Sequence, residues 1–467
     1  MGSPAGLVVK LKAPETRKDN NMRRYCKNVD ITDTGFIECC IYLWLDEKKK
    51  RRDVQRFLAQ YSQVLNFRDI QDLLASGQKK FLEEIVHNIT LDIQKRIKQR
   101  KLDLPPIFFK LRYDDCCCKW RKIGIEAPIH QIFDYIVVEA CKDLFYAKIG
   151  PYQMASIPDR GQEQGVKAIF KWMQTDPTKT RYFVKLDVRQ CYPSIPHDKL
   201  KAVFTRDIKN PTLLWLIYEL IDAFPTGLSI GSYFSQFACN YYLSRIYHYI
   251  AEKLYRVQIR RGNETRVRLI HHHLFYMDDI LLLASSKKDA GISRAQKVIE
   301  YAHDILGLEI KSNWKVVETD YIGKGDKHHG HFVDMMGYRI YRDHITIRRT
   351  TFKRCRRAVI RVEVRLKEGK DIPLSLARRV SSHNGRFKYS DSFAFSSEHN
   401  VPKIVSACGR VISSDTKRRI LDNEDRSTRI SKARGALLQY FDDSEHWKHC
   451  GSVDQAEYQT AGGICPF

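Results

Sequence analysis

The sequence lacks the patterns that mark secreted, membrane-spanning or zinc-finger proteins. Its thirteen cysteines stand singly or in adjacent runs such as 116–118, with no Cys-x-x-Cys pair and no nearby histidine at zinc-binding spacing. No apolar run approaches the length of a membrane span, and charged residues interrupt the first twenty positions, where a signal peptide needs an apolar segment. No low-complexity tract or repeat period is visible. We therefore expect a folded, soluble cytoplasmic enzyme with reduced thiols and no membrane partner.

The charge of the chain is strongly positive. Its 467 residues include 80 Lys and Arg against 55 Asp and Glu, which gives a formal net charge of +25 and a pI near 9.5. This excess indicates a polyanionic partner, nucleic acid first and a membrane surface second, although a surface that only favours solubility is the simpler alternative. The length exceeds that of a usual single core, so two or three subdomains in one body are expected.

Apolar periodicity predicts a helical N-terminal region and a mixed centre. Residues 45–104 have helical spacing that ends at a Pro-Pro pair, 107–125 alternate like a hairpin, and 128–144 return to helix. The elements predicted next are a strand at 182–188, helices at 213–224, 234–254 and 289–306, strands at 272–276 and 280–284, a hairpin at 332–347 and a basic helix beyond 348.

Three aspartates are the candidate catalytic residues. Asp187 ends an apolar run, and Asp278 and Asp279 lie at the tight turn between two predicted strands. If these strands pair in one antiparallel sheet, the carboxylates converge and repel one another, which raises their pKa values unless cations bind there. Two Mg²⁺ ions on shared carboxylates can perform in-line nucleotidyl transfer, which is polymerase chemistry. The alternative is an ordinary Asp-rich turn.

These aspartates belong to an ordered set of motifs that resembles the reverse transcriptase family. Residues 119–122 (Lys-Trp-Arg-Lys) resemble its fingers motif, 186–195 (Leu-Asp-Val-Arg-Gln-Cys-Tyr-Pro-Ser-Ile) its motif A and 276–279 (Tyr-Met-Asp-Asp) its motif C. The resemblance runs from about residue 118 to about residue 349. It implies an RNA-directed DNA polymerase with an α+β right-hand fold, in which fingers and a palm with an antiparallel sheet are followed by a helical thumb.

The resemblance also implies domain boundaries and metal ligands. The chain would divide into a helical N-terminal region (1–104), fingers and palm (105–349), and a basic helical thumb with a C-terminal tail (350–467). Asp187, Asp278 and Asp279, assisted by the Val188 carbonyl, would hold two Mg²⁺ ions, for which Mn²⁺ is a substitute.

By the same resemblance, further side chains would surround the incoming nucleotide. Tyr192 would exclude a ribose 2′-hydroxyl, and Lys311 would protonate the leaving pyrophosphate. The alternatives are a core aromatic residue and a surface lysine no better placed than Lys315. The other candidates are the triphosphate-binding residues Lys119, Arg121 and Lys122, the pocket residues Ile230, Gly231 and Gln236, and the primer-grip residues Met336, Gly337 and Tyr338. A solvated basic turn is the alternative for the first group, and core packing for the last.

Ile230 and Gln236 distinguish this chain from most of the family, which has Gln and Pro at these positions. The pairing is similar to the reverse transcriptases of diversity-generating retroelements, which copy a template RNA with errors opposite adenines. Because Ile cannot hydrogen-bond as Gln does, the pocket would constrain the nucleotide less. The alternatives are an antiphage defence reverse transcriptase and a non-catalytic RNA-binding protein. The resemblance implies a bacterial or phage-encoded protein.

The implied partners are nucleic acids and one protein. They are a template RNA, an RNA–DNA heteroduplex, dNTPs and, from the subgroup, a small basic helical accessory protein. Basic residues from Lys353 to Arg379 would follow the phosphates of the heteroduplex through salt-sensitive contacts. No carboxylate set for RNase H activity is evident after them.

Overall fold

The computed structural model describes residues 24–431 except 63–64, 77–78, 115–118, 291 and 326. The first part of the N-terminal region, the cysteine run at 116–118 and the part of the tail beyond 431 therefore lie outside the described residues. Among the described residues, no helix is both long enough and apolar enough to cross a membrane.

Helices form the N-terminal region, as the periodicity predicted. They are α1 (Thr34–Lys48), α2 (Arg52–Gln60), α3 (Phe67–Ser76) and α4 (Lys79–Gln99). The Asp33 side chain caps α1 by accepting a hydrogen bond from the Phe36 amide at 2.7 Å. Buried Trp44 on α1 contacts Gln131 on α5 (Pro128–Ala140), so these helices pack directly on the next region.

The predicted hairpin after the Pro-Pro pair is confirmed. Its strands are β1 (Phe108–Asp114) and β2 (Lys119–Ile125), which pair antiparallel. The single helix predicted at 128–144 is wrong, because the chain forms two helices, α5 and α6 (Lys142–Lys148). They separate at Cys141, whose backbone (φ −94°, ψ 6°) leaves the helical region.

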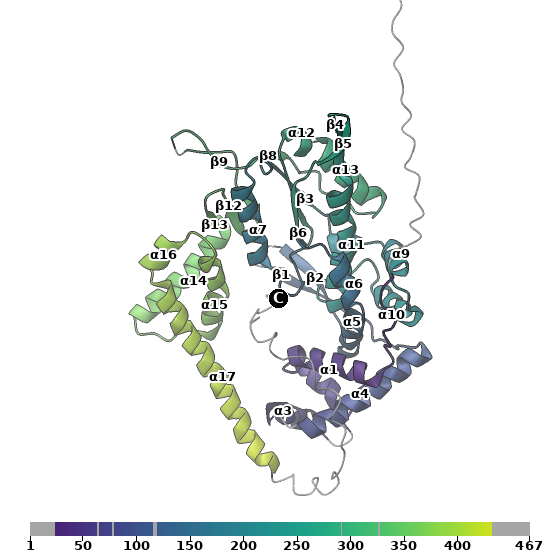
Figure 1. Ribbon diagram of the computed structural model, residues 1–467. Helices are drawn as coiled ribbons and strands as arrows, with labels where there is room; N and C mark the ends of the chain where they lie inside the picture. The colour runs from purple at the N-terminus through teal and green to yellow at the C-terminus, as the bar shows by residue number, and fades with distance from the viewer. Residues whose placement is uncertain are drawn as a thin grey trace, which may run out of the picture.

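A four-stranded antiparallel sheet lies at the centre of the molecule (Figure 1). In spatial order its strands are β6 (His272–Tyr276), β7 (Asp279–Ala284), β3 (Tyr182–Asp187) and β8 (Val316–Glu318). Alternate residues of β7 enter different cores, since Ile280 and Leu282 join one and Leu281 and Leu283 the other. Burial on both faces explains the continuous apolar run in the sequence.

The two cores show how the regions are joined. One core contains residues of α1–α6 and one face of the sheet, while the other joins the opposite face to α7 (Gln162–Thr175) and the C-terminal helices. The first core crosses residue 104 without a break, so the N-terminal helices pack as one body with the central region. The boundaries at 104 and 349 stay predictions.

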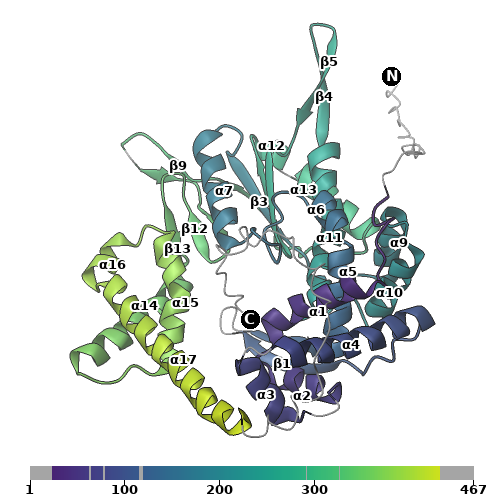
Figure 2. The same cartoon turned by 60° about the horizontal axis from the view of Figure 1, so that its bottom comes forward.

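The remaining elements of the central region flank the sheet. They are α8 (Cys191–Ser194), α9 (His197–Asp207), α10 (Pro211–Asp222), α11 (Tyr233–Lys253), β4 (Tyr255–Arg260), β5 (Asn263–Arg268), α12 (Lys287–Ala290) and α13 (Ile292–Asp304). Figure 2 shows that the β4–β5 hairpin projects away from the body. This hairpin was not among the predicted elements, and its residues are mostly exposed.

Small strands and a helical region follow the central sheet. They are β9 (Tyr321–Ile322), β10 (His328–His329), β11 (Val333–Met335), β12 (Tyr338–Ile340), β13 (Ile345–Ile347), α14 (Arg349–Lys367), α15 (Leu374–Lys388), α16 (Phe393–Glu398) and α17 (Val401–Ser431). The predicted hairpin at 332–347 is a three-stranded sheet in the order β11-β12-β13. The predicted basic helix is α14.

The elements form two walls around a central floor (Figures 1 and 2). The β1–β2 hairpin and the N-terminal helices make one wall, the sheet makes the floor, and α14–α17 make the other wall. Long α17 reaches from that second wall to α3, with which it is in contact. The α+β right-hand arrangement of fingers, palm and thumb is therefore confirmed.

Candidate active site

The three aspartates meet at one end of the palm sheet. Tyr276 pairs with Asp279 across the β6–β7 hairpin, which leaves Met277 and Asp278 as a two-residue turn, with Met277 at φ +53°. On the other side of β7, Asp279 pairs with Asp187 of β3. The Val188 amide donates a hydrogen bond to the Asp278 carbonyl oxygen at 3.0 Å. Strand register therefore brings together residues that are distant in the sequence.

Burial and mutual repulsion raise the pKa values of two of these carboxyl groups. For Asp278, burial raises the pKa most, the charges of Asp279 and Asp187 raise it further, and the charge of Arg121 lowers it. For Asp279, burial raises the pKa and the ammonium of Lys185, 3.9 Å from Oδ1, lowers it. Both carboxyl groups are thus harder to ionise than in water, chiefly because burial removes the water that would solvate their charges.

Lys311 makes an ion pair with the third carboxylate. Its amide donates to the Asp187 carbonyl oxygen at 2.9 Å, because the bridge between Val188 and Ile310 places this segment beside the end of β3. Its Nζ lies 2.7 Å from Asp187 Oδ1 and donates to Oδ2 at 2.8 Å. Both side chains are partly exposed, so the pair adds little stability. Lys311 is thus at the carboxylates, and Lys315 is exposed.

Tyr192 lies against the aspartate turn. Its hydroxyl is 3.9 Å from the sulfur of Met277. The Leu228 amide donates to the Tyr192 carbonyl oxygen at 2.8 Å, which joins α8 to the loop before α11. Burial raises the pKa of Tyr192 well above its usual value. The Tyr192 ring is therefore uncharged and lies beside the turn.

The loop with Ile230 and Gly231 meets the fingers strand β2. The Gly124 amide donates to the Ile230 carbonyl oxygen at 3.1 Å. Gly231 has φ +112°, and a Cβ there would lie 2.9 Å from the Gly124 carbonyl oxygen, so only glycine fits. Gln236 follows in the first turns of α11, where its carbonyl oxygen accepts a hydrogen bond from Asn240 Nδ2 at 3.0 Å.

The three basic residues of β2 do not share one face. Side chains alternate along a strand, so Lys119 and Arg121 lie on one face and Lys122 on the other. Arg121 is close enough to lower the Asp278 pKa. Lys122 instead places its ammonium 4.3 Å from the centre of the Phe109 ring. The structure brings Arg121 toward the carboxylates and places Lys122 on the opposite face of β2.

The β11–β12 turn holds the three predicted primer-grip residues. Met336 and Gly337 form the turn with φ +54° and +83°, and the Gly337 carbonyl oxygen accepts a hydrogen bond from the Arg348 amide at 2.9 Å. The side chains of Met336 and Tyr338 are buried in the second core. Core packing therefore accounts for both side chains, and the turn itself presents the backbone of Met336 and Gly337.

Sequence reasoning missed the residues that hold this turn to the palm. Lys185 Nζ donates to the Asp334 carbonyl oxygen at 2.7 Å, and Arg348 Nε donates to Asp334 Oδ1 at 2.6 Å. Lys185 is also the nearest cation to Asp279 on its own sheet. Only its alternation with buried Val184 and Leu186 could have indicated that it faces a different partner.

Sequence reasoning also missed Asp134, which holds the start of α11. Asp134 Oδ2 accepts hydrogen bonds from Ser232 Oγ at 2.8 Å and from the Phe234 amide at 3.1 Å. Burial raises the pKa of Asp134 to about 6. Ser232 is readable in the sequence as an N-cap, but its distant partner is not.

Comparison with known proteins agrees with this geometry. Residues 100–325, which include the fingers hairpin, the palm sheet and all three aspartates, match the family model described as reverse transcriptase (RNA-dependent DNA polymerase). These residues form a reverse transcriptase domain. Domains of this family are RNA-directed DNA polymerases, which are nucleotidyltransferases, and generally use divalent metal ions.

The solved structures that are similar to this chain are distant from it. The telomerase of Candida tropicalis, truncated from its C-terminal domain and without ligand, is 12% identical with a TM-score of 0.36, over 52% of this chain and 55% of that one. The telomerase of Candida albicans bound to a TWJ fragment of telomeric RNA is 11% identical with a TM-score of 0.35, over 69% of this chain and 63% of that one. The telomerase of C. tropicalis bound to the same kind of fragment is 12% identical with a TM-score of 0.39, over 71% of this chain and 58% of that one. This chain thus spans 55–63% of their length. No curated protein matches it.

The three carboxylates fit a hard divalent cation. Carboxylate and carbonyl oxygens are the donors that Mg²⁺ and Mn²⁺ prefer, and here they come from three adjacent positions of one sheet end. Asp187 Oδ1 is buried and, among the described residues, receives no hydrogen bond of acceptable geometry. The Lys311 ammonium, 2.7 Å away, is the cation that this oxygen meets. A divalent ion among the three carboxylates would relieve the repulsion that raises the pKa of Asp278.

Proposed function

We propose that this chain copies an RNA template into DNA with Asp187, Asp278 and Asp279 as the metal-binding residues of the reaction. The observation that carries the proposal is the register of the palm sheet, which pairs Asp187 with Asp279 beside the turn that holds Asp278. Two Mg²⁺ ions, or Mn²⁺ in their place, supply activation of the primer hydroxyl and stabilisation of the departing pyrophosphate. A protein that only binds RNA would not need three carboxylates gathered against their own repulsion.

The side chains around the carboxylates have roles in holding the nucleotide. Arg121 faces the carboxylate end of the sheet from the fingers and would hold the triphosphate through its guanidinium fork, with exposed Lys119 on the same face. Lys311 carries an ammonium at Asp187 and would donate a proton to the leaving pyrophosphate. Lys122 has no such position, because it packs on Phe109.

Tyr192 would select deoxynucleotides by its bulk. The Tyr192 hydroxyl lies 3.9 Å from the Met277 sulfur, so a sugar next to the carboxylates would meet this ring. DNA is therefore the proposed product.

Ile230 and Gln236 support the finer proposal that the polymerase serves a diversity-generating retroelement and errs at template adenines. The backbone of Ile230 is fixed by the Gly124 amide, and its side chain offers no hydrogen bond where most of the family has Gln. A pocket with fewer polar constraints discriminates less between correct and incorrect base pairs. The proposed partners of the chain are a template RNA and a small basic helical accessory protein.

The thumb is suited to the RNA–DNA heteroduplex. Lys353, Arg356, Arg357 and Arg361 are exposed on α14. The opposite face of that helix, with Cys355, Val359 and Val362, is buried in the second core. The buried stripe fixes the orientation of α14, so the basic face is held toward solvent as a rigid row of phosphate contacts.

The proposal is tested by DNA synthesis on a primed RNA template with Mg²⁺ and dNTPs. Asp278→Asn keeps the shape of the turn and removes a carboxylate charge, so incorporation should fall by at least about 100-fold. Asp304→Asn, at an exposed carboxylate at the end of α13, is the matched control and should keep wild-type synthesis. Equal synthesis by Asp278→Asn and Asp304→Asn would refute the assignment.

Fidelity tests the finer proposal separately. Ile230→Gln should lower misincorporation opposite template adenine while correct incorporation continues. Unchanged misincorporation would refute the role of Ile230 and leave the polymerase assignment intact.

A further inference from the structure

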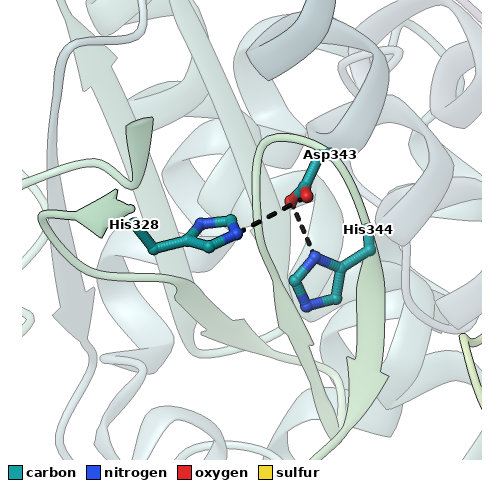
Figure 3. A group of neighbouring side chains, drawn as sticks. All are labelled: His328, Asp343 and His344. Carbon is teal, nitrogen blue, oxygen red and sulfur yellow. Dashed lines mark hydrogen bonds and ion pairs between the residues drawn. The ribbon is translucent and has the colours of Figure 1, made fainter. Parts of the chain in front are cut away.

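A histidine-rich group lies outside the polymerase site. His328 on β10 faces Asp343 and His344, which occupy the turn between β12 and β13 (Figure 3). One nitrogen or oxygen atom of each side chain lies within 4.8 Å of such an atom of the other two. The three residues come from two different hairpins, so the fold and not the local sequence assembles them.

This group is separate from the catalytic aspartates. Arg342 is next to Asp343, and its Nη1 lies 3.4 Å from the hydroxyl of Thr180, which is two residues before the start of β3. Asp187 is the last residue of β3. At about 3.3 Å per residue, the strand separates the two places by on the order of 15–20 Å. The histidine group therefore cannot share an ion with the aspartates.

A buried carboxylate fixes the orientation of His328. Asp320 is 2% exposed, and its Oδ1 lies 2.8 Å from His328 Nδ1. Its Oδ2 accepts a hydrogen bond from the Arg342 amide at 2.9 Å, so Asp320 itself is held in place. Histidines that bind metal ions usually donate their second ring N–H to such a carboxylate. The arrangement leaves His328 Nε2 as the atom available to a ligand.

The atoms opposite His328 Nε2 are electron donors as well. Asp343 Oδ2 lies 3.5 Å from it, and Asp343 Oδ1 lies 2.7 Å from His344 Nδ1. The Asp320 hydrogen bond and the charges of Asp320 and Asp343 raise the pKa of His328, so a cation that binds between Nε2 and Asp343 takes the place of the proton on Nε2. Stacking on Tyr341, with ring centres 4.3 Å apart, holds the His344 ring in its place.

We propose that His328, Asp343 and His344 bind a divalent transition-metal ion of the Zn²⁺ class. Two imidazoles and a carboxylate suit Zn²⁺, Co²⁺ or Ni²⁺, whereas Mg²⁺ prefers oxygen donors alone. The three side chains are 38%, 42% and 29% exposed, so the ion can enter from solvent, and a water molecule would complete a tetrahedral shell. The ion would join the β9–β10 hairpin to the β12–β13 turn and so brace the sheet that carries Gly337.

The test is metal binding by the full, untagged chain in the presence of excess Mg²⁺, which occupies the aspartates. Titration calorimetry should detect one equivalent of Zn²⁺ per chain. Co²⁺ should give the visible absorption of a tetrahedral site without the sulfur charge-transfer bands of thiolate ligands. Wild type without either signal would overturn the proposal.

Substitutions locate the ion. His328→Ala, His344→Ala and Asp343→Asn should each weaken Zn²⁺ binding at least 10-fold, and Asp320→Asn should weaken it about 10-fold through the orientation of His328. His329→Ala is the matched control, since this adjacent histidine stacks on Tyr321 and belongs to no ligand group among the described residues. Wild-type Zn²⁺ affinity in both His328→Ala and His344→Ala would overturn the assignment.

Folding controls keep the result interpretable. Each variant is compared with His329→Ala for its metal-free thermal midpoint and for Mg²⁺-dependent DNA synthesis. Zn²⁺ should raise the thermal midpoint of wild type and of His329→Ala and leave the ligand variants unchanged. If a substitution unfolds the protein, the Co²⁺ spectrum of the wild type alone decides whether the proposed site binds a metal ion. Neither metal-binding result tests the role of the three aspartates, because an error in that assignment would appear in the DNA synthesis assay.

Discussion

Gly227 should be indispensable to the position of Tyr192. Its backbone has φ +54°, and a Cβ at this position would lie 2.5 Å from the carbonyl carbon and oxygen of Pro193 and also overlap the Tyr192 carbonyl oxygen. These are backbone atoms of the segment that follows Asp187, so no side-chain rotation can relieve the overlap. Gly227→Ala therefore forces α8 and the loop at 227–231 apart.

The cost of Gly227→Ala can be worked out from the structure. An L-residue at this φ costs about 1 kcal/mol or more, and loss of the hydrogen bond from the Leu228 amide to the Tyr192 carbonyl oxygen costs about 1 kcal/mol. Separation of the packed backbone segments adds a similar amount. The free energy of unfolding should thus fall by about 2–4 kcal/mol, and the displaced Tyr192 ring should admit ribonucleotides.

Two assays check this prediction. Thermal unfolding should show a midpoint several degrees lower for Gly227→Ala, and primer extension should show a higher ratio of rNTP to dNTP incorporation. Gly409→Ala is the control, because this glycine of α17 has no atom within 4 Å of an added Cβ and Ala favours the helix. A variant as stable and as selective as wild type would refute the account of this loop.

Three further predictions follow from the same structure. Tyr192→Ala should raise the rNTP to dNTP incorporation ratio at least about 10-fold in primer extension with little change in dNTP synthesis, and an unchanged ratio would exclude steric selection by this ring. Arg356→Ala with Arg357→Ala should flatten the salt dependence of heteroduplex binding, measured by fluorescence anisotropy, by about two units of slope, while the same slope as wild type would place the duplex elsewhere. Burial lowers the pKa of His273 from 6.5 to about 3. Between these pH values the unfolded chain binds one more proton at His273 than the folded chain does. The free energy of unfolding should therefore fall as pH falls below 6.5, by up to about 1.4 kcal/mol per pH unit. Between pH 6.5 and 5 the thermal midpoint should depend less on pH in His273→Gln than in His303→Gln, a substitution of an exposed histidine. Parallel curves of midpoint against pH would contradict this.

The palm could be predicted because its elements have strong local signals. The apolar strands around Met277 and Asp278 and the run that ends at Asp187 are each complete within a few residues. What pairs Asp187 with Asp279 is strand register, which no short segment specifies. The family resemblance supplied that step, and the structure then showed the neighbouring strands.

Contacts between distant segments could not be predicted. The pairs Lys185 with Asp334 and Asp134 with Ser232 depend on how helices and sheets pack. The β4–β5 hairpin could have been predicted, because Tyr255, Val257 and Ile259 alternate with polar residues before a turn at Gly262. For Lys122, too, the period of two along β2 was available in the sequence and already separates it from Arg121.

The metal-binding role of the three aspartates can be tested most directly by replacing Mg²⁺ with Fe²⁺ and mapping backbone cleavage by the hydroxyl radicals that the bound iron generates with ascorbate and peroxide. We expect cuts near residues 187–188 and 278–279 that Mg²⁺ suppresses and that Asp278→Asn loses, whereas Asp304→Asn keeps them. Cuts at these residues that persist in Asp278→Asn, or that Mg²⁺ does not suppress, would contradict the assignment of Asp187, Asp278 and Asp279 as the metal ligands of this polymerase.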